Sequence, residues 1–290
     1  MPKLLQLHLI VFLLAVTGII GQLVDLPAPS LVVWRTVLAA LAAAFWVMVV
    51  HRRAIIPPRG SLLSMMGVGL VVGLHWLSFF GAIRISNVSI ALAGFATTSL
   101  FTAFTEAWFE KRKVKRFEFF VGLIVVAGIL LIAGGARDHW AGLGLSVISA
   151  ALAAVFPVLN RSLVREHDPL VIVMWEMVGA CLLCLAVVPW FGGYVAMISI
   201  SMVDFGWLLV LAIVCTVFAH GFQVHLLRSL SAYTSNLAIN FEPIYGMLLA
   251  AWIFHEYESL TVSFYAGAFV IVAANLLHPV VVTLQSKMKQ

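Results

Sequence analysis

The chain has 290 residues, of which 63% are hydrophobic and only 10% are charged, and its mean hydropathy is +1.10. A soluble domain of this composition would lack the polar side chains needed to cover its surface, so the composition excludes a soluble protein. The net charge of +5 comes from basic residues in the predicted loops, as membrane orientation requires, and it calls for no nucleic-acid partner. We therefore expect an integral membrane protein in contact with the lipid bilayer.

Long apolar segments separated by short polar connections fill almost the whole chain. A hydrocarbon core about 30 Å thick requires roughly 20 residues of helix, and each apolar segment has about that length. No connection is long enough to form a separate soluble domain. The sequence predicts an all-α integral membrane protein with ten transmembrane helices, at approximately 5–24, 30–50, 61–83, 87–109, 117–135, 141–160, 169–188, 206–227, 232–254 and 260–280.

Basic residues are concentrated in alternate predicted loops. With both termini inside, fourteen of the seventeen Lys and Arg residues fall on the cytoplasmic side. This bias predicts a multi-pass protein of the cell (inner) membrane with both termini in the cytoplasm. Cys181, Cys184 and Cys215 all fall within predicted spans and have no metal-ligand spacing, so we expect neither disulfides nor a metal site.

The two halves of the chain repeat one pattern. A shift of 145 residues aligns His75 with His220, and a shift of 141 residues aligns Trp34 with Trp175. Paired His and paired Trp residues are less readily explained by chance than paired aliphatic residues, and they indicate an internal duplication. The predicted repeats are residues 1–138 and 139–290.

Each half contains five predicted spans, which is an odd number, so the second half must enter the membrane in the opposite orientation. The loop at 110–116 is basic and predicted inside, whereas the equivalent loop at 255–258 is acidic and predicted outside. We therefore predict two inverted five-helix repeats. Inverted repeats place a binding site near the midplane of the membrane, at their interface, and alternating access is the mechanism that this symmetry favours.

Four short motifs occur in order along the two halves of the chain. They are Trp34-Arg35-Thr36, the segment from Ala82 to Ser89, the segment from Phe156 to Arg161, and Glu258-Ser259-Leu260-Thr261 with Gly267 nine residues after the Glu. In these motifs the chain resembles, over essentially its full length, the ten-helix EamA-type branch of the drug/metabolite transporter superfamily. The resemblance implies export or exchange of small metabolites such as amino acids, driven by substrate or ion gradients, with neither ATP nor a cofactor.

The chain departs from the family pattern before the fifth span. There the family's acidic residue would fall near Lys113, whereas Glu110 lies three positions earlier. No role is therefore carried over to this loop.

Charged residues within the spans are candidates for a function. Each costs at least about 2.5 kcal/mol to insert and calls for a partner or a role. Arg35, about five residues inside the outer end of its span, either bonds helix-end carbonyls, attracts a substrate carboxylate or closes an outer gate. Its repeat equivalent, Glu176, falls near the inner end of another span, so we do not expect the two to pair.

Three further ionisable residues lie deep in predicted spans. His75 and His220 both fall near mid-depth, where each either packs as a satisfied neutral ring or contacts substrate and carries a proton. Glu242 either binds a substrate ammonium group, carries a proton, or has a buried structural partner. Pro243 removes a backbone hydrogen bond from the ninth span and is the predicted hinge.

Polar and aromatic residues near these groups complete the candidate site. They occur mainly in the third, fourth, eighth and ninth spans, which we expect to surround the substrate path. Helix packing is the alternative explanation for each of them, and Gly69 with Gly73 is expected to have that role alone. The remaining candidates are Trp76, Asn87, Thr98, Trp175, Asn236, Asn240 and Tyr245.

These features predict a secondary-active transporter that exports small metabolites, most favourably amino acids, with proton coupling as a further hypothesis. The alternative is a nucleotide-sugar or sugar-phosphate exchanger of the same fold. Its dianionic substrates should require two or more buried basic residues, but the spans contain Arg35 alone. An intramembrane enzyme is the least favoured reading, because no span carries an H-E-x-x-H or G-x-S-x-G motif.

Overall fold

The computed structural model describes residues 3–228, apart from 110, 112, 115 and 136, and residues 241–287. Every regular element in these ranges is a helix. The first half of the chain contains α1 (Lys3–Leu23), α2 (Ala28–Phe45) with its π-helical continuation η1 (Trp46–Val50), α3 (Arg59–Ile85), α4 (Val88–Phe95), α5 (Thr98–Phe109) and α6 (Arg116–Gly135).

The second half of the chain has a similar order of elements. Short 3-10 turns precede α7, follow α9 and follow α14. The elements are η2 (Arg137–His139), α7 (Trp140–Ala153), α8 (Phe156–Glu166), α9 (Pro169–Val187), η3 (Val188–Trp190), α10 (Gly193–Ile198), α11 (Met202–Val210), the π-helix η4 (Leu211–Phe218), α12 (Ala219–Leu226), α14 (Glu242–Phe254), η5 (Glu256–Glu258) and α15 (Val262–Lys287).

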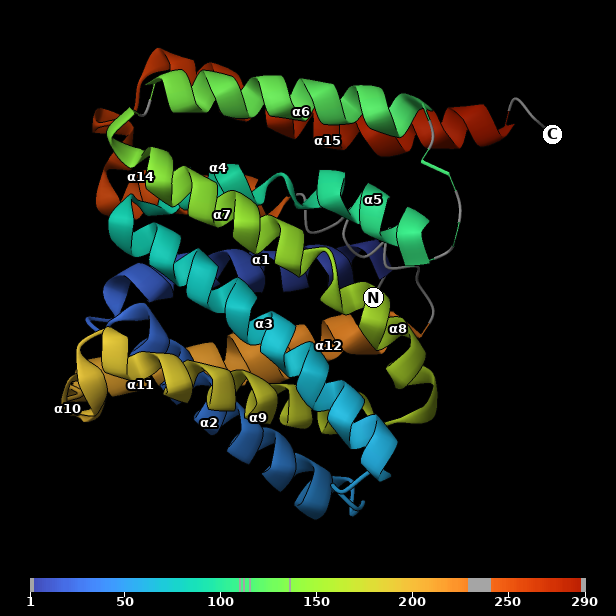
Figure 1. The fold of residues 1–290 in the computed structure, drawn as a ribbon, viewed down its shortest axis with the longest axis vertical. Helices are drawn as coiled ribbons and strands as arrows, with labels where there is room; N and C mark the ends of the chain where they lie inside the picture. Colours follow the sequence, from blue (N-terminus) through green and yellow to red (C-terminus); the bar gives the residue numbers. More distant parts are fainter. Residues whose placement is uncertain are drawn as a thin grey trace.

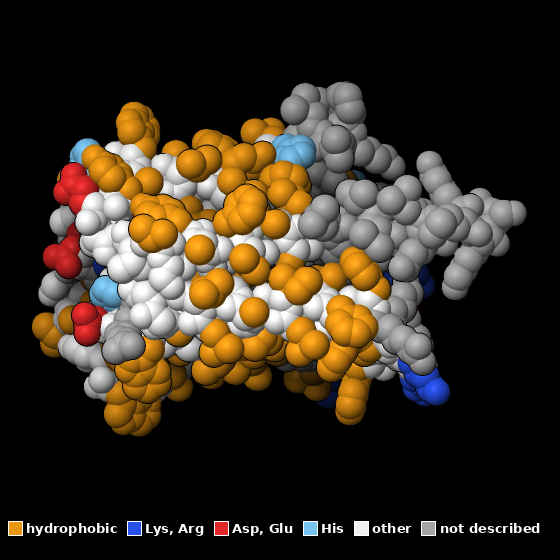
Figure 2. Space-filling view, turned by 90° about the horizontal axis from the view of Figure 1, so that it is seen from above, with side chains coloured by type: hydrophobic (Ala, Val, Ile, Leu, Met, Phe, Trp, Pro, Cys, Tyr) orange, Lys and Arg blue, Asp and Glu red, His pale blue; other side chains and the backbone are white. Residues whose placement is uncertain are grey.

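Six continuous helical segments in the described ranges are long and apolar enough to cross a membrane, and four further apolar helices are shorter. Large apolar side chains such as Trp108, Leu130 and Phe269 are exposed on the outside of these helices, as contact with lipid tails requires. Figure 2 shows apolar side chains along the flank, acidic ones gathered at one end and basic ones at the other.

Two of the predicted spans are broken helices. The segment predicted at 87–109 consists of α4 and α5, which are interrupted at Ala96 and Thr97, where the Thr97 hydroxyl donates to the Gly94 carbonyl at 2.8 Å. A hydroxyl bound to a nearby carbonyl competes with the helical hydrogen bonds. The segment predicted at 141–160 consists of α7 and α8, and Pro157, which has no backbone N–H, lies in the first turn of α8.

Several helices also extend beyond the predicted boundaries. Helix α3 adds two residues at each end of the predicted span 61–83. Helix α11 begins at Met202 rather than 206, because the hydroxyl of Ser201 caps it by accepting from the Asp204 backbone N–H at 3.0 Å. Of the predicted span 232–254, residues 232–240 lie outside the described residues.

The helices are arranged in layers along the long axis of the molecule. Helices α6 and α15 pack together at one end, and α2 lies at the other end beside α9 (Figure 1). Between these pairs, α4 contacts both α7 and α14, and α3 packs against both α7 and α9. The largest group of buried apolar residues lies among α2, α3 and α9, and a second group joins α4 with α6 and α15.

Close contact between α3 and α9 depends on small residues. A side chain added at Gly69 would collide with the Glu176 backbone, and one added at Gly179 would collide with the Met66 backbone. The structure therefore confirms a packing role for Gly69, and Gly73 lies beside the Ala180 backbone in the same contact.

Two tryptophans make reciprocal hydrogen bonds between the halves. The Trp34 indole in α2 donates to the Met197 carbonyl at 2.8 Å, and the Trp175 indole in α9 donates to the Ile55 carbonyl at 2.7 Å. Met197 follows Ile55 in the chain at almost the same interval as Trp175 follows Trp34. Equivalent residues therefore make equivalent contacts in the two halves.

Candidate functional site

A cavity of about 50 Å³ lies in the middle of the helix layers, and both halves of the chain line it. Helices α1, α2 and α3 contribute to its wall, together with α12, the first residue of α14, and the two breaks between α4 and α5 and between α7 and α8. Each ordered water occupies roughly 10–15 Å³ in such a measure, so the cavity has room for only a few waters. The described conformation is therefore too contracted to enclose a metabolite.

Arg35 lies on this cavity rather than at the outer surface. Its side chain is 1% exposed, its Nε donates to the Thr216 hydroxyl at 2.8 Å, and its guanidinium carbon lies 3.7 Å from the centre of the Trp76 ring. Stacking on an indole stabilises a desolvated cation. The buried Nη1 atom has no hydrogen-bond partner among the described residues. A guanidinium held in this way presents an unused donor to an anionic group.

The local structure around Thr216 explains how Arg35 is positioned. Thr216 lies in the π-helix η4, and its hydroxyl donates to the Leu211 carbonyl five residues earlier at 2.8 Å. Its oxygen is therefore oriented to accept from Arg35. π-Helical turns are rare and occur frequently at functional sites.

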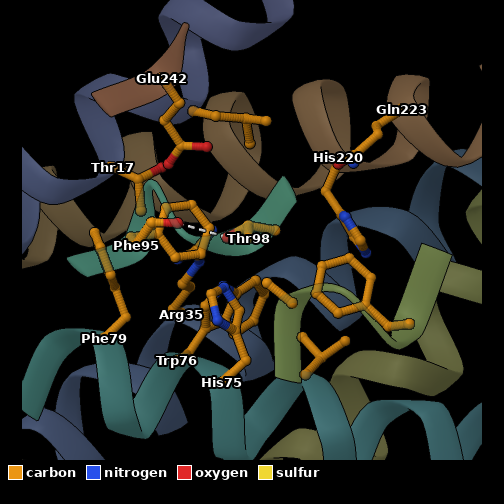
Figure 3. A pocket seen from close by; sticks show the side chains of 14 residues that line it. Thr17, Arg35, His75, Trp76, Phe79, Phe95, Thr98, His220, Gln223 and Glu242 are labelled. Carbon is orange, nitrogen blue, oxygen red and sulfur yellow. Dashed lines mark hydrogen bonds between the residues drawn. The ribbon is translucent and has the colours of Figure 1, made fainter. Parts of the chain in front are cut away.

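Glu242 faces the same cavity from the second half of the chain. It is the first residue of α14 and is buried, and its side chain lines the cavity together with that of Arg35 (Figure 3). A carboxylate at a helix N-terminus is favoured by the helix dipole. An acidic residue, Glu242, and a basic residue, Arg35, from different halves of the chain therefore line the same small cavity.

His75 is held in α3 by Ser149 of α7. The Ser149 hydroxyl donates its hydrogen to the His75 carbonyl at 3.0 Å. His75 Nδ1 lies 2.8 Å from the oxygen of this hydroxyl and 3.1 Å from the Ser149 carbonyl. Because the hydroxyl hydrogen is already used, Nδ1 must be the donor to Ser149. In the neutral ring Nε2 is then the hydrogen-bond acceptor. The ring also stacks on Phe95, with ring centres 5.5 Å apart.

His220 connects the cavity to a buried carboxylate. Its Nε2 lies 2.9 Å from Glu176 Oε2, and the Asn160 amide donates to Glu176 Oε1 at 2.6 Å. Glu176 is completely buried, so these two donors replace its hydration. The chain of contacts therefore runs from the cavity through α12 to α9 and α8.

The Phe156 ring lies between the two histidines. Its centre is 5.8 Å from the His75 ring and 5.7 Å from the His220 ring. Trp76, Phe79 and Phe95 extend this aromatic wall (Figure 3). The site is therefore an apolar chamber with a few polar groups, as is typical of small-molecule sites.

The structure places three other candidates away from the cavity. Asn87 caps α4 by accepting from the Ile90 N–H at 2.8 Å, and Trp175 bonds the Ile55 carbonyl. The Tyr245 hydroxyl lies 3.1 Å from His8 Nδ1, beyond the lining residues. Each of the three therefore has a hydrogen-bond partner away from the cavity.

Two candidates lie outside the described residues, and one lies beside the cavity. Asn236 and Asn240 belong to the range that the structure leaves undescribed. Pro243 occupies the first turn of α14, next to Glu242. Of the predicted lining residues, the structure brings together Arg35, His75, Trp76, Thr98, His220 and Glu242.

The cavity also contains residues that sequence reasoning missed. We expected four spans to surround the path, but α1 supplies Thr17, and the start of α8 supplies Phe156. Gln223 follows His220 by three positions and therefore shares its helix face, a signal that could have identified it. Phe156 begins one of the four short motifs, which could have drawn attention to it, whereas Thr17 has no such signal, because hydroxyl residues occur throughout these helices.

Comparisons with known proteins agree with this architecture. The model of the EamA-like transporter family matches residues 1–134 and again residues 140–278. A solved crystal structure of a protein has the same fold, with a TM-score of 0.66 at 13% identity over 94% of this chain and 96% of that one. The comparison with curated proteins gives no match. A family match over both halves of the chain is sufficient to assign it: this multi-pass membrane protein belongs to the EamA-like transporter family.

Proposed function

We propose that the chain is a secondary-active exporter of small amino-acid-like metabolites, which bind in the Arg35 and Glu242 cavity. The observation that carries the proposal is the buried Arg35 Nη1, which has no hydrogen-bond partner among the described residues and belongs to a side chain that lines the same cavity as Glu242. A guanidinium suits a substrate carboxylate, and a carboxylate suits a substrate ammonium group. An amino acid carries both groups on one carbon atom.

The proposed architecture has ten transmembrane helices in two inverted repeats, residues 1–138 and 139–290. The six long and four shorter apolar helices together make ten. The reciprocal bonds of Trp34 and Trp175 support a pseudo-twofold relation. So do Lys111 and His255, which end equivalent segments with positive φ angles of 52° and 54°.

Alternating access is the proposed mechanism. The cavity lies between the repeats and is contracted to about 50 Å³, so a metabolite can enter only after one repeat moves relative to the other. The helix breaks beside Thr98 and Phe156 are natural points for this motion. His220, with Glu176 behind it, provides a proton acceptor at the cavity wall, and proton entry is the proposed driving force.

The proposed location is the cell (inner) membrane, with both termini in the cytoplasm. Basic side chains gather at one end of the molecule and acidic ones at the other (Figure 2), which is the distribution that short cytoplasmic and external loops adopt. Labelling of single cysteines tests this topology. We expect Lys113→Cys to react only from the inside and Glu258→Cys only from the outside; reaction of both from one side would contradict the inverted repeat.

Exchange of nucleotide sugars or sugar phosphates is disfavoured by the charge of the cavity. Among the lining residues the permanent positive charge is that of Arg35, and the carboxylate of Glu242 opposes this charge. A dianionic phosphate group would be buried there beside a carboxylate, which is unfavourable.

Counterflow into proteoliposomes tests the function. Vesicles loaded with an unlabelled amino acid should accumulate the labelled compound faster than empty vesicles, and the amine without the carboxylate should replace it only weakly. Acceleration by nucleotide sugars alone would support the exchanger, and chemical conversion of the solute would indicate an enzyme. Equal uptake by loaded and empty vesicles would indicate a channel.

A further inference from the structure

A second and larger hollow lies at the basic end of the molecule. It has a volume of about 680 Å³ and lies between η1, the start of α9 and the segment formed by η4 and α12. Its wall is formed by exposed or half-buried apolar residues of these helices, chiefly Trp46, Ile213, Val217, Phe218 and Phe222. Since these residues belong to apolar helices of a multi-pass membrane protein, the wall faces lipid tails rather than water.

One side of the hollow is a flat ladder of stacked rings. Phe218 and Phe222 lie with ring centres 6.3 Å apart and planes at 3°, and His225 continues the stack at 5.9 Å and 12°. Gly221 lies beside this ladder and allows Leu170 of α9 to pack closely against α12 at the floor of the hollow. A flat, open apolar wall about as long as two helical turns suits an extended hydrocarbon chain.

Cationic groups gather where the apolar wall ends. The carboxylate of Asp168 caps α9 at the Leu170 N–H, and it holds both Arg53 Nη1 and His51 Nδ1 at 3.2 Å. Arg228 is fixed from the other side, where its Nε donates to the Val164 carbonyl and its Nη2 to the His167 carbonyl, each at 2.9 Å.

The charges at this point are mainly positive. The lining contains two guanidinium groups against the single carboxylate of Asp168. Arg53 is 66% exposed at its side chain, so its remaining N–H donors are open to a ligand. An anionic oxygen placed between Arg53 and Arg228 would receive hydrogen bonds from both guanidinium groups.

We propose that this hollow binds one anionic phospholipid of the membrane leaflet at the basic end of the protein. The phosphodiester group lies between Arg53 and Arg228, and an acyl chain lies along the Phe218 and Phe222 ladder. The match of charge and of apolar surface favours this lipid over simpler occupants, because a free phosphate makes no use of the apolar wall and a zwitterionic lipid brings an extra cation to a basic site. Basic pockets between transmembrane helices on the cytoplasmic side bind such headgroups.

Native mass spectrometry of the full chain, freed of lipid in detergent, tests the proposal. Phosphatidylglycerol and phosphatidylcholine with identical acyl chains are titrated in parallel. We expect about tenfold tighter binding of phosphatidylglycerol, and about fivefold weaker binding of it when Arg53→Gln or Arg228→Gln removes one cation. Arg59→Gln is the matched control, because Arg59 begins α3 at the same end but does not line the hollow.

Each alternative occupant has its own outcome in this experiment. Equal affinity for the two lipids, or an equal loss in Arg59→Gln, would overturn the proposal. Glycerol 3-phosphate binding as tightly as phosphatidylglycerol would show a soluble-anion site instead, and a dimer mass that disappears on lipid addition would show a second copy in the hollow. Because Arg228 also supports two backbone carbonyls, the exposed Arg53 variant keeps the test decisive if Arg228→Gln is unstable.

Discussion

The imidazole of His220 and the carboxylate of Glu176 form a buried pair, with Nε2 and Oε2 2.9 Å apart and only His220 lining the cavity. Glu176 belongs to α9 and His220 to α12, so the pair also fixes these helices relative to each other. Their arrangement links substrate binding to a buried charge, and it leads to the first prediction.

Glu176→Gln and His220→Ala should each lower transport at least tenfold, which corresponds to about 1.4 kcal/mol. Each change removes the pair and leaves a buried polar group without its partner, at a cost of about 1–3 kcal/mol in stability. Counterflow rates and thermal unfolding measure the two effects. The double variant should be no slower than the worse single variant. Losses that simply multiply would show that the residues act independently.

Arg35→Gln should lower kcat/KM for amino acids roughly 30-fold or more, because a charge-assisted bond to the substrate carboxylate is worth about 2–3 kcal/mol. Arg35→Lys should be intermediate, since an ammonium group lacks the planar pair of donors. Transport of the corresponding amine, which has no carboxylate, should fall much less. Arg59→Gln, at the surface of α3, serves as the matched control. Equal losses for acid and amine would assign Arg35 to structure alone.

Glu242→Gln should either abolish transport or remove its dependence on pH, since the amide cannot carry a proton. The comparison is of counterflow rates between about pH 5.5 and 8, where a coupled carrier with histidines at its site should change its rate. Glu258→Gln is the control, because Glu258 is an exposed acid outside the cavity. A pH profile of Glu242→Gln that matches the unmodified protein would exclude the proton role.

Gly69→Ala should destabilise the protein by about 1–3 kcal/mol, because the added methyl group collides with the Glu176 backbone and pushes α3 away from α9. Gly67→Ala is the matched control on the same helix, since nothing lies within 4 Å of the added atom. Its midpoint of thermal unfolding should stay the same or rise, as Ala favours helix over Gly. Equal midpoints for the two variants would contradict the packing described for Gly69.

The long apolar helices are predictable because hydrophobic length is a local property of the sequence. The breaks at Ala96–Thr97 and Ala154–Val155 are not, because residue types that are common throughout the chain produce them. These are the Thr97 hydroxyl, which is bonded to the Gly94 carbonyl, and Pro157, two residues after Val155. Both breaks lie at the cavity. The positions of the breaks depend on which faces of the helices pack together, and the hydropathy of the sequence does not contain this information.

The charged members of the site are also predictable, because an ionisable group in a membrane needs a polar environment and such groups tend to share one. Arg35, His75, His220 and Glu242 therefore meet at one cavity. The partner of each group is not predictable in this way. Asn160 reaches Glu176 only because the α8 and α9 hairpin brings them together, and an apolar sequence contains little information about pairing between helices.

Trp34→Phe and Trp175→Phe should shift the conformational equilibrium in opposite directions. Each indole holds one repeat to a connecting segment of the other, α10 for Trp34 and the loop before α3 for Trp175, and by the proposed topology the Trp34 bond lies at the outer side and the Trp175 bond at the inner side. Phenylalanine keeps the ring but removes the donor, at a cost of about 1 kcal/mol, which is roughly a fivefold change in population. Labelling rates of a single cysteine at His220 or Thr17, measured from each side, report the change. Trp34→Phe should increase access from outside, Trp175→Phe should increase access from inside, and the double variant should restore the original balance because the two changes cancel. A shift of both single variants toward the same side would show that the reciprocal bonds hold the fold together without distinguishing the two open states.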